Sequence, residues 1–458
     1  MRPKARELCG VVRYSWTILA LKSGLYLVIK SASQSLELLS NNYEALHSTP
    51  NGAETTKFPF RLGFGLLFGL LGWLIPYLGV NSTLLPAKIQ QIAPDQKVQI
   101  VALLATIAMI VATIANIIEG ALSDRTVSRW GKRNPWIVLG LITTLICFYW
   151  LTKVTTIKGI IINWSLFQVA LNMMVAPIVA FIADKAPKKY RGSISAFYGV
   201  GMNIGTPVGT MIASRYLTKI NSGIYAFMIF EVIFTIIGLL LVGDGSNKGE
   251  KVKELHGSEL LEAFIFPIHG DVRDFYLVVF GKLLFVSAQF VITGYQLYIF
   301  VDYMKLSSAS AAHNLSVMST ILLITGVSFA IIGGPLADRF HSLKALVAAS
   351  TVVMGIGVAF PAFDAAPWTM FAYAALSGAA MGMYNSVDQA LNVSVLPNPD
   401  NAAKDLGIVN LANSLGQVFG PIMASVIIGA VGYKMMFPAA GLMCLVGAGL
   451  IMLIKKVH

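Results

Sequence analysis

Long apolar segments recur along most of the chain, and short polar or charged connections separate them. From Phe58 onward there are twelve, each at least about 18 residues long, close to the length that a helix needs to cross a bilayer. They cover residues 60–80, 98–121, 136–153, 160–182, 194–217, 223–243, 275–301, 313–336, 344–363, 367–391, 405–430 and 434–454. The ten-residue alternation typical of membrane strands is missing. Because a helix satisfies its own backbone in lipid, the pattern predicts an all-α membrane protein.

The composition agrees with this pattern and excludes two broad classes of protein. Hydrophobic residues make up 56% of the 458 residues and charged residues only 12%, whereas soluble domains carry about 25% charged residues. A soluble enzyme and a disordered protein are both excluded. The three cysteines form no metal or disulfide pattern, and we find no phosphate-binding loop or zinc motif. We therefore expect no enzymatic activity, no metal and no cofactor other than a proton or sodium gradient.

The net charge of +12 is explained by where the basic residues lie. Most of the Lys and Arg fall in the first 57 residues or in the connections that follow even-numbered segments, which is typical of cytoplasmic loops. Both termini are thus predicted to be cytoplasmic, in a multi-pass protein of the plasma or inner membrane. The lipid bilayer, and not nucleic acid, is the partner that this charge pattern predicts.

The segments predict four parts of the chain. Residues 1–57 are expected to form a cytoplasmic tail, because Lys22 interrupts their best apolar run. Residues 58–243 and 274–458 each contain six segments and predict two six-helix bundles. Residues 244–273 begin as a polar linker and become amphipathic, which predicts a central cytoplasmic loop with a surface helix.

Two pairs of short motifs indicate an internal repeat. Gly120-Ala-Leu-Ser-Asp124-Arg125 follows the second segment and Gly334-Pro-Leu-Ala-Asp338-Arg339 follows the eighth, an offset of 338 − 124 = 214. Gly205 to Gly209 in the fifth segment matches Gly416 to Gly420 in the eleventh, at an offset of 211. Parallel repeats of this kind are typical of transporters whose halves rock around a central site.

The connection after the second segment carries the most specific motif. Its sequence, Gly120-Ala-Leu-Ser-Asp124-Arg125-Thr-Val-Ser-Arg129-Trp-Gly131-Lys132-Arg133-Asn134-Pro135-Trp136, resembles the loop 2–3 signature of the major facilitator superfamily. The extended form is similar to that of sucrose:proton symporters and related glycoside–pentoside–hexuronide transporters, although Asn134 replaces a basic residue. Tyr295-Gln296-Leu297-Tyr298 followed by Asp302-Tyr303 is similar to the same branch. The resemblance implies twelve transmembrane helices in two pseudo-symmetric bundles, a monomer, and sugar transport by alternating access.

The motif also provides candidates for an inner gate. Asp124 ends the second segment and is placed to accept hydrogen bonds from Arg129 or Arg133, which would hold the two halves together. Alternatively, the basic residues only anchor the topology. The gating candidates are Gly120, Asp124, Arg125, Arg129, Gly131, Lys132, Arg133, Asp338 and Arg339.

Four ionisable residues lie inside the predicted spans, where a charge costs about 2.5–3.5 kcal/mol on insertion scales. Glu231, Asp388 and Glu119 are candidates for binding the coupling ion, and Lys282 for contacting the solute. The alternatives are that Glu231 faces lipid in its protonated form, that Asp388 pairs with Lys282, that Lys282 reaches the membrane surface, and that Glu119 belongs to the inner gate.

Amides and aromatic rings supply the candidate substrate-binding groups. Sugars are bound through hydroxyl–amide hydrogen bonds and aromatic faces, whereas amides in spans also serve as interhelical contacts. The candidates are Trp73, Tyr77, Asn81, Gln168, Asn172, Asn203, Lys282, Gln289, Gln296, Asn385, Asn410 and Asn413, with Gln417 continuing the last stripe.

The sequence thus predicts a secondary active transporter of a small solute, with sugar or glycoside symport driven by protons as the first hypothesis. Proton-coupled efflux of metabolites or drugs uses the same fold and stays open, because the aromatic residues and Glu231 suit it as well. A membrane receptor that does not transport is the alternative of another class.

Overall fold

A computed structural model describes residues 58–187, 190–249, 272–340, 342–397 and 402–455 of the chain. By its contacts the chain divides into two units, Met1–Phe58 and Pro59–His458, and all the described helices belong to the second. The predicted tail, and the predicted surface helix near residues 255–265, lie outside the described residues.

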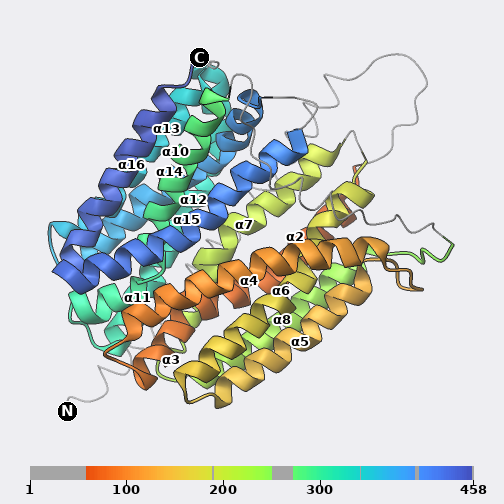
Figure 1. Cartoon of the computed structure of the whole chain (residues 1–458), viewed down its shortest axis with the longest axis horizontal. Helices are drawn as coiled ribbons and strands as arrows, with labels where there is room; N and C mark the ends of the chain where they lie inside the picture. The colour runs from red at the N-terminus through yellow and green to blue at the C-terminus, as the bar shows by residue number, and fades with distance from the viewer. Residues whose placement is uncertain (1–57, 188–189, 250–271, 341, 398–401, 456–458) are drawn as a thin grey trace, which may run out of the picture. The chain divides into compact units, whose positions relative to one another are not determined.

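The described part is built from helices (Figure 1). In chain order these are α2 (Phe60–Gly79), η1 (Val80–Leu84), α3 (Leu85–Ile92), α4 (Lys97–Arg125), α5 (Asn134–Lys153), α6 (Ile157–Lys185), α7 (Arg191–Ser214), α8 (Ile220–Val242), α10 (Arg273–Thr293), α11 (Gln296–Tyr298), η3 (Ile299–Tyr303), α12 (Ser308–Phe340), α13 (Leu343–Ala359), η4 (Phe360–Ala362), α14 (Pro367–Ser394), α15 (Ala402–Val431), η6 (Tyr433–Met435) and α16 (Met436–Met452).

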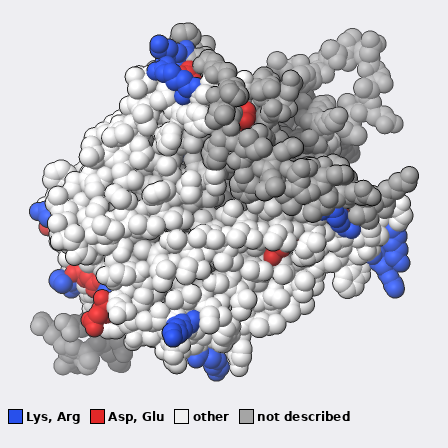
Figure 2. All heavy atoms as spheres, in the orientation of Figure 1, with Lys and Arg blue, Asp and Glu red and all other residues white. Residues whose placement is uncertain are grey.

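Each of the twelve predicted spans coincides with a described helix, so the prediction of an all-helical membrane protein is confirmed. Ten of the helices are long and apolar enough to cross a membrane. The two others are α7 and α14, whose sequences are richer in Gly, Ser, Thr and Asn. Figure 2 shows a broad uncharged surface with most of the visible charges at its margins, as a lipid-facing surface requires.

We call the end of the helices that carries residues 126–133 and 243–249 the inner end, which the charge pattern predicts to be cytoplasmic, and the opposite end the outer end. Local sequence explains where several helices begin and end. The Thr156 side chain caps α6 by accepting from the Gly159 amide, and Ser342 caps α13 in the same way. Gly432 follows α15 with a φ of 86°, a conformation that glycine adopts at little cost.

Two groups of helices pack mainly within themselves. In the N-terminal group α2 packs on α6, α7 and α8, while α6 also packs on α4 and α5. In the C-terminal group α10 packs on α13, α15 and α16, and α14 packs on α12 and α13. The groups meet through α7 with α12 and through α4 with α15, and Figure 1 shows the latter pair lying side by side. The exact boundaries at residues 243 and 274 stay predictions.

The predicted repeat is visible as a repeated close approach of two helices. A Cβ atom added to Gly209 would lie 2.7 Å from the Ile75 carbonyl oxygen, and one added to Gly420 would collide with the Ser287 carbonyl oxygen. The offsets are 420 − 209 = 211 and 287 − 75 = 212. The glycine motifs therefore allow α7 to touch α2, and α15 to touch α10, at equivalent points.

We expect Gly209→Ala to destabilise the protein by about 1–3 kcal/mol, because the backbone of α2 would have to move away from the new methyl group. Gly199→Ala is the matched control, since it lies on the same helix and its added Cβ would meet no atom within 4 Å. Thermal unfolding of both variants in detergent measures the difference. Equal melting temperatures would contradict a tight α2–α7 contact.

Candidate functional site

A small cavity of about 60 Å³, partly open to solvent, lies between the two groups of helices. The N-terminal group contributes α2, η1, α3, α4 and α6 to its walls, and the C-terminal group contributes α10 and α15. Its lining residues are Tyr77, Asn81, Leu85, Pro86, Ile89, Val101, Leu104, Ala105, Ala108, Met109, Ala112, Gln168, Phe290, Gly294, Gln417 and Pro421.

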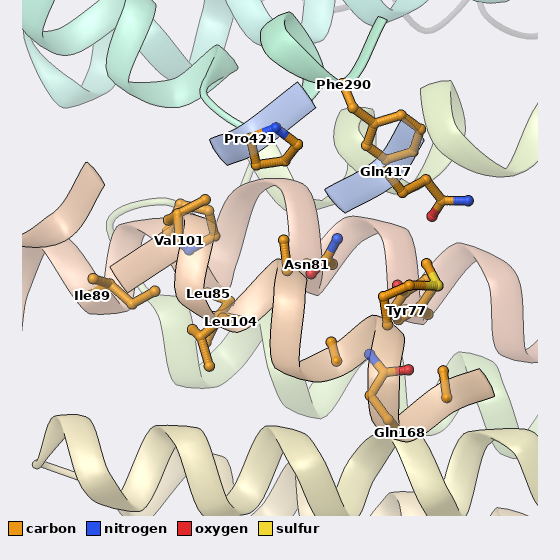
Figure 3. Close-up of a pocket in the computed structure, with 16 residues that line it drawn as sticks. Tyr77, Asn81, Leu85, Ile89, Val101, Leu104, Gln168, Phe290, Gln417 and Pro421 are labelled. Atoms are coloured by element: carbon orange, nitrogen blue, oxygen red, sulfur yellow. The ribbon is translucent and has the colours of Figure 1, made fainter. Parts of the chain in front are cut away.

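The polar groups in the cavity are three amides and a phenol. Figure 3 shows Gln168 and Gln417 on opposite sides of the cavity, with Tyr77 and Asn81 between them. Gln168 is only 2% exposed, and its Nε2 makes no hydrogen bond of normal geometry among the described residues, although its side chain lies beside the Tyr77 hydroxyl. The described lining contains no Asp, Glu, Lys, Arg or His. The cavity therefore suits an uncharged solute that offers hydrogen-bonding groups and an apolar face.

Tyrosine hydroxyls close the outer side of this cavity. The Tyr295 hydroxyl lies 3.0 Å from the Val98 carbonyl oxygen in the N-terminal group and 2.9 Å from that of Pro421 in the C-terminal group. The Tyr298 hydroxyl donates to the Pro86 carbonyl at 2.9 Å. Since Pro86 and Pro421 also line the cavity, these bonds join its two walls.

Gln296 adds a third bond of this type. Pro86 has no N–H and so leaves the Ser82 carbonyl, four residues earlier, without its usual helical donor. The Gln296 Nε2 lies 3.4 Å from that carbonyl oxygen and 3.4 Å from the Thr210 hydroxyl. Gln296 thus stands outside the cavity lining, in the contact between the two groups.

An ion pair completes the outer contact. The Lys97 Nζ lies 2.7 Å from the Asp302 carboxylate, and the Tyr433 hydroxyl donates to the same carboxylate at 2.8 Å. The Lys97 ammonium also lies over the Tyr298 ring, 4.9 Å from its centre. We call Tyr295, Gln296, Tyr298 and the pair of Lys97 and Asp302 the outer seam.

Further toward the inner end, an amide pair links α7 to α14. The Asn385 Nδ2 donates to the Asn203 Oδ1 at 2.8 Å. These two substrate-binding candidates therefore contact each other and do not line the cavity.

The signature loop forms an ionic network around Arg133. The buried Arg133 guanidinium donates to Asp124, to the Asp184 Oδ2 at 2.9 Å and to the Ser123 hydroxyl at 3.0 Å. Lys132 binds the Asp184 Oδ1 at 3.0 Å. All these residues belong to α4, α5, α6 or the connection between them, so the network that is described joins helices of the N-terminal group.

The start of the central loop is fixed to this network. The Asp244 carboxylate accepts from the Arg133 amide at 3.1 Å and from Lys185 at 3.1 Å. It packs against Gly131, which has a φ of 84° and leaves no room for a Cβ. Asn247 continues the contact, because its side chain accepts from the Ser128 amide and donates to the Thr126 carbonyl.

The remaining gating candidates have other surroundings. Arg125 donates to the Ala121 carbonyl on its own helix, and Arg129 is exposed. Gly120 faces Ala176 of α6 at an ordinary packing distance. Arg339 is exposed near the end of α12, and the side chain of Asp338 lies outside the described residues.

Two of the ionisable candidates pair inside the C-terminal group. The Lys282 Nζ lies 2.5 Å from the Asp388 Oδ2, and the Asn392 amide donates to the same oxygen at 2.9 Å. Both side chains are buried, so the alternative that Asp388 pairs with Lys282 holds. Neither residue lines the cavity.

The two other acids are buried in the N-terminal group. Glu231 is 1% exposed and faces α5, where the Thr144 hydroxyl donates to its Oε1 at 2.8 Å. It therefore does not face lipid. Glu119 on α4 is 3% exposed, and neither acid lines the cavity.

The other amide and aromatic candidates lie around the cavity without lining it. Trp73 is buried one turn inward of Tyr77, and Asn172 accepts from Asn116. Gln289 is half-buried on α10. On α15 Asn410 is exposed and Asn413 half-buried, whereas Gln417 lines the cavity.

Comparison with known proteins agrees with this architecture. The sequence pattern of the Major Facilitator Superfamily matches residues 57–312 and 283–458. The chain belongs to the Major Facilitator Superfamily. Membership in that superfamily makes it a multi-pass secondary transporter of small solutes.

One curated relative is a lactose permease from Leuconostoc lactis, 26% identical over 239 residues. That match covers 46% of this chain and 37% of the permease, so the chain spans well under half the length of this relative.

Solved superfamily structures share the fold. The nucleoside transporter NupG matches with a TM-score of 0.67 at 15% identity, over 86% of this chain and 99% of its own. A bacterial homologue of the human lysosomal transporter Spinster, in an inward-facing and unoccupied conformation, matches with a TM-score of 0.65 at 14% identity. The match covers 88% of this chain and 98% of the homologue. A POT family transporter in complex with 5-aminolevulinic acid matches with a TM-score of 0.69 at 12% identity. The match covers 85% of this chain and 95% of that transporter.

If the outer seam holds this superfamily member closed outward, Tyr298→Phe will expose the cavity to the outer side. Loss of one hydrogen bond, worth about 0.5–1.5 kcal/mol, shifts the open–closed equilibrium about 2- to 12-fold. The measurement is labelling of Asn81→Cys by an impermeant maleimide added outside, with the three native cysteines replaced. Tyr303→Phe is the control, because its hydroxyl bonds the Pro361 carbonyl at 2.9 Å within one group. Equal labelling in both variants would contradict the gating role.

Breaking the buried ion pair should destabilise the C-terminal group. Lys282→Met leaves Asp388 buried without its cation, which costs about 3–5 kcal/mol. The double variant Lys282→Met with Asp388→Leu should recover most of that loss. Thermal unfolding in detergent compares them, and a single variant as stable as the wild type would refute a structural pair.

Proposed function

We propose that the chain takes up a sugar or glycoside by alternating access, coupled to the symport of protons. The main support for this proposal is the chemical nature of the residues that line the cavity. Its polar groups are amides and a phenol, and no charged side chain lies among its described lining residues. A neutral polyhydroxylated solute loses no ionic partner on entering such a site, whereas a charged solute would have to leave its hydration shell without compensation.

The partial similarity to a lactose permease supports the same class of solute. So does the resemblance of the loop from Asp124 to Trp136 to the sucrose and glycoside branch. We assign solute contact to Tyr77, Asn81, Gln168 and Gln417, two of which face each other across the cavity.

The cavity also supports a second candidate, proton-coupled efflux of amphiphilic compounds. Leu85, Ile89, Val101, Leu104 and Phe290 give it a large apolar wall. An apolar solute would fill that wall but leave the buried Gln168 amide without a partner, which disfavours this candidate.

The test is uptake of labelled lactose into proteoliposomes with an imposed pH gradient, acidic outside. We expect accumulation that collapses when an uncoupler dissipates the gradient. Uptake that is unchanged by the uncoupler would overturn coupling. No uptake of any tested saccharide, together with efflux of a lipophilic dye, would favour the second candidate.

Gln168→Leu should raise the KM for the saccharide about 2- to 12-fold, because one neutral hydrogen bond is worth about 0.5–1.5 kcal/mol. Gln289→Leu is the matched control, since this glutamine also lies on a span but does not line the cavity. Initial uptake rates over a range of concentrations give both KM values. Equal values would remove Gln168 from the solute site.

A further inference from the structure

Glu119 lies on the face of α4 that carries the cavity. It continues a buried stripe formed by Ala108, Ala115 and Ser123. Ala112, which lines the cavity, precedes it by seven residues, or about two helical turns. The carboxyl group is therefore about 10 Å further toward the inner end along the same helix face.

Glu119 differs from Glu231 and Asp388, the two other coupling candidates, in having no ion pair and no side-chain hydrogen bond among the described residues. Its Oε2 has no hydrogen-bond partner among the described residues, and no described ion pair includes it. By contrast, Asp388 is neutralised by Lys282, and Glu231 accepts from Thr144. A carboxyl group buried in this way carries a proton more easily than a charge.

A chain of amides connects the cavity to the turn that precedes Glu119. The Asn172 Nδ2 donates to the Gln168 carbonyl at 2.8 Å, and the Asn116 Nδ2 donates to the Asn172 Oδ1 at 3.0 Å. Asn116 and Glu119 are three residues apart and thus neighbours on the helix surface. Because the link at Gln168 is its main-chain carbonyl, a solute bound by the Gln168 side chain would act on this chain through the backbone of α6.

On its inner side Glu119 adjoins the Arg133 network. Ser123, one turn further along α4, accepts from the Arg133 guanidinium at 3.0 Å. Three described helices pack on α4, and their charged residues with described side chains are Lys88 on α3, Lys158, Asp184 and Lys185 on α6, and Asp405 on α15. On α4 itself, apart from Glu119, and in the connection after it they are Lys97, Asp124, Arg125, Arg129, Lys132 and Arg133. Arg133, Asp184 and Lys185 are held in ion pairs.

We propose that Glu119 is the group that carries the coupling proton, an inference that rests on the proposed symport. The carboxylate binds a proton when the cavity opens outward, and the neutral acid stays buried during the conformational change. The proton leaves to water when the inner end opens and Arg133 moves relative to Ser123, so that one proton enters and one leaves for each cycle. Glu231 and Asp388 then act as structural groups.

The test compares Glu119→Gln with Glu231→Gln in proteoliposomes, using labelled lactose. Glu119→Gln should lower gradient-driven accumulation to the equilibrium ratio of about 1 while keeping lactose counterflow, which needs no net proton movement, within about twofold. Glu231→Gln should keep both activities. Glu119→Asp should restore accumulation with a shifted pH profile. Replacing sodium by choline should change nothing, and a loss of accumulation on that replacement would overturn the proton as the coupling ion.

A second measurement does not depend on the solute. Infrared difference spectra of the purified protein between acid and alkaline pH should show a buried carboxyl C=O band that Glu119→Gln removes and Glu231→Gln keeps. Accumulation by Glu119→Gln at the wild-type ratio, or a titrating band that survives this substitution, overturns the proposal. If the wild-type protein transports no lactose but shows the band, the proposed solute is wrong and the proton site stands.

Discussion

Hydrogen bonds from side chains of one helix group to main-chain carbonyls of the other hold the outer ends together, and the cavity depends on them. Tyr298 and Gln296 reach carbonyls in the segment around Pro86, and Tyr295 lies between the carbonyls of Val98 and Pro421. A carbonyl freed by proline inside a membrane is costly unless it finds a donor. Pro86 frees the Ser82 carbonyl in this way, and Gln296 of the opposite group supplies the donor. Pro86 and Pro421 also line the cavity.

The inner end is organised differently. In the N-terminal group, the described ionic contacts around Arg133 join α4, α5, α6 and the residues after α8. The bond described across the two groups on that side is a single neutral pair, Asn203 with Asn385. A neutral hydrogen bond contributes about 0.5–1.5 kcal/mol, which the several bonds of the outer seam exceed. Among the described contacts, more hydrogen bonds join the two groups at the outer end than at the inner end.

Segment length, charge asymmetry and two glycine motifs were enough to predict the helices and their repeat, because spanning a bilayer leaves few alternatives. Side-chain direction was far less predictable. These helices are apolar on most sides, so periodicity did not separate Gln168, which lines the cavity, from Gln289, which does not. Tyr295 and Tyr298 were visible only as part of a family resemblance. Their hydrogen-bond partners are backbone carbonyls, which every residue has, so the sequence does not indicate which residues provide them.

The buried acids show how this limit bears on function. Glu231, one of the three coupling candidates, lies in the middle of its span, yet its carboxylate accepts from Thr144 and does not line the cavity. The Asp388 carboxylate forms an ion pair with the Lys282 ammonium. Burial alone does not distinguish the three acids, since all are less than a tenth exposed. Glu119 differs from the other two in its position on α4, between the uncharged cavity and the network around Arg133. A rearrangement of the cavity or of that network would change the free energy of ionising its carboxyl group. Proton coupling requires a carboxyl group whose ionisation responds to its surroundings in this way. The Asp388 carboxylate, which is already paired with Lys282, lacks this property.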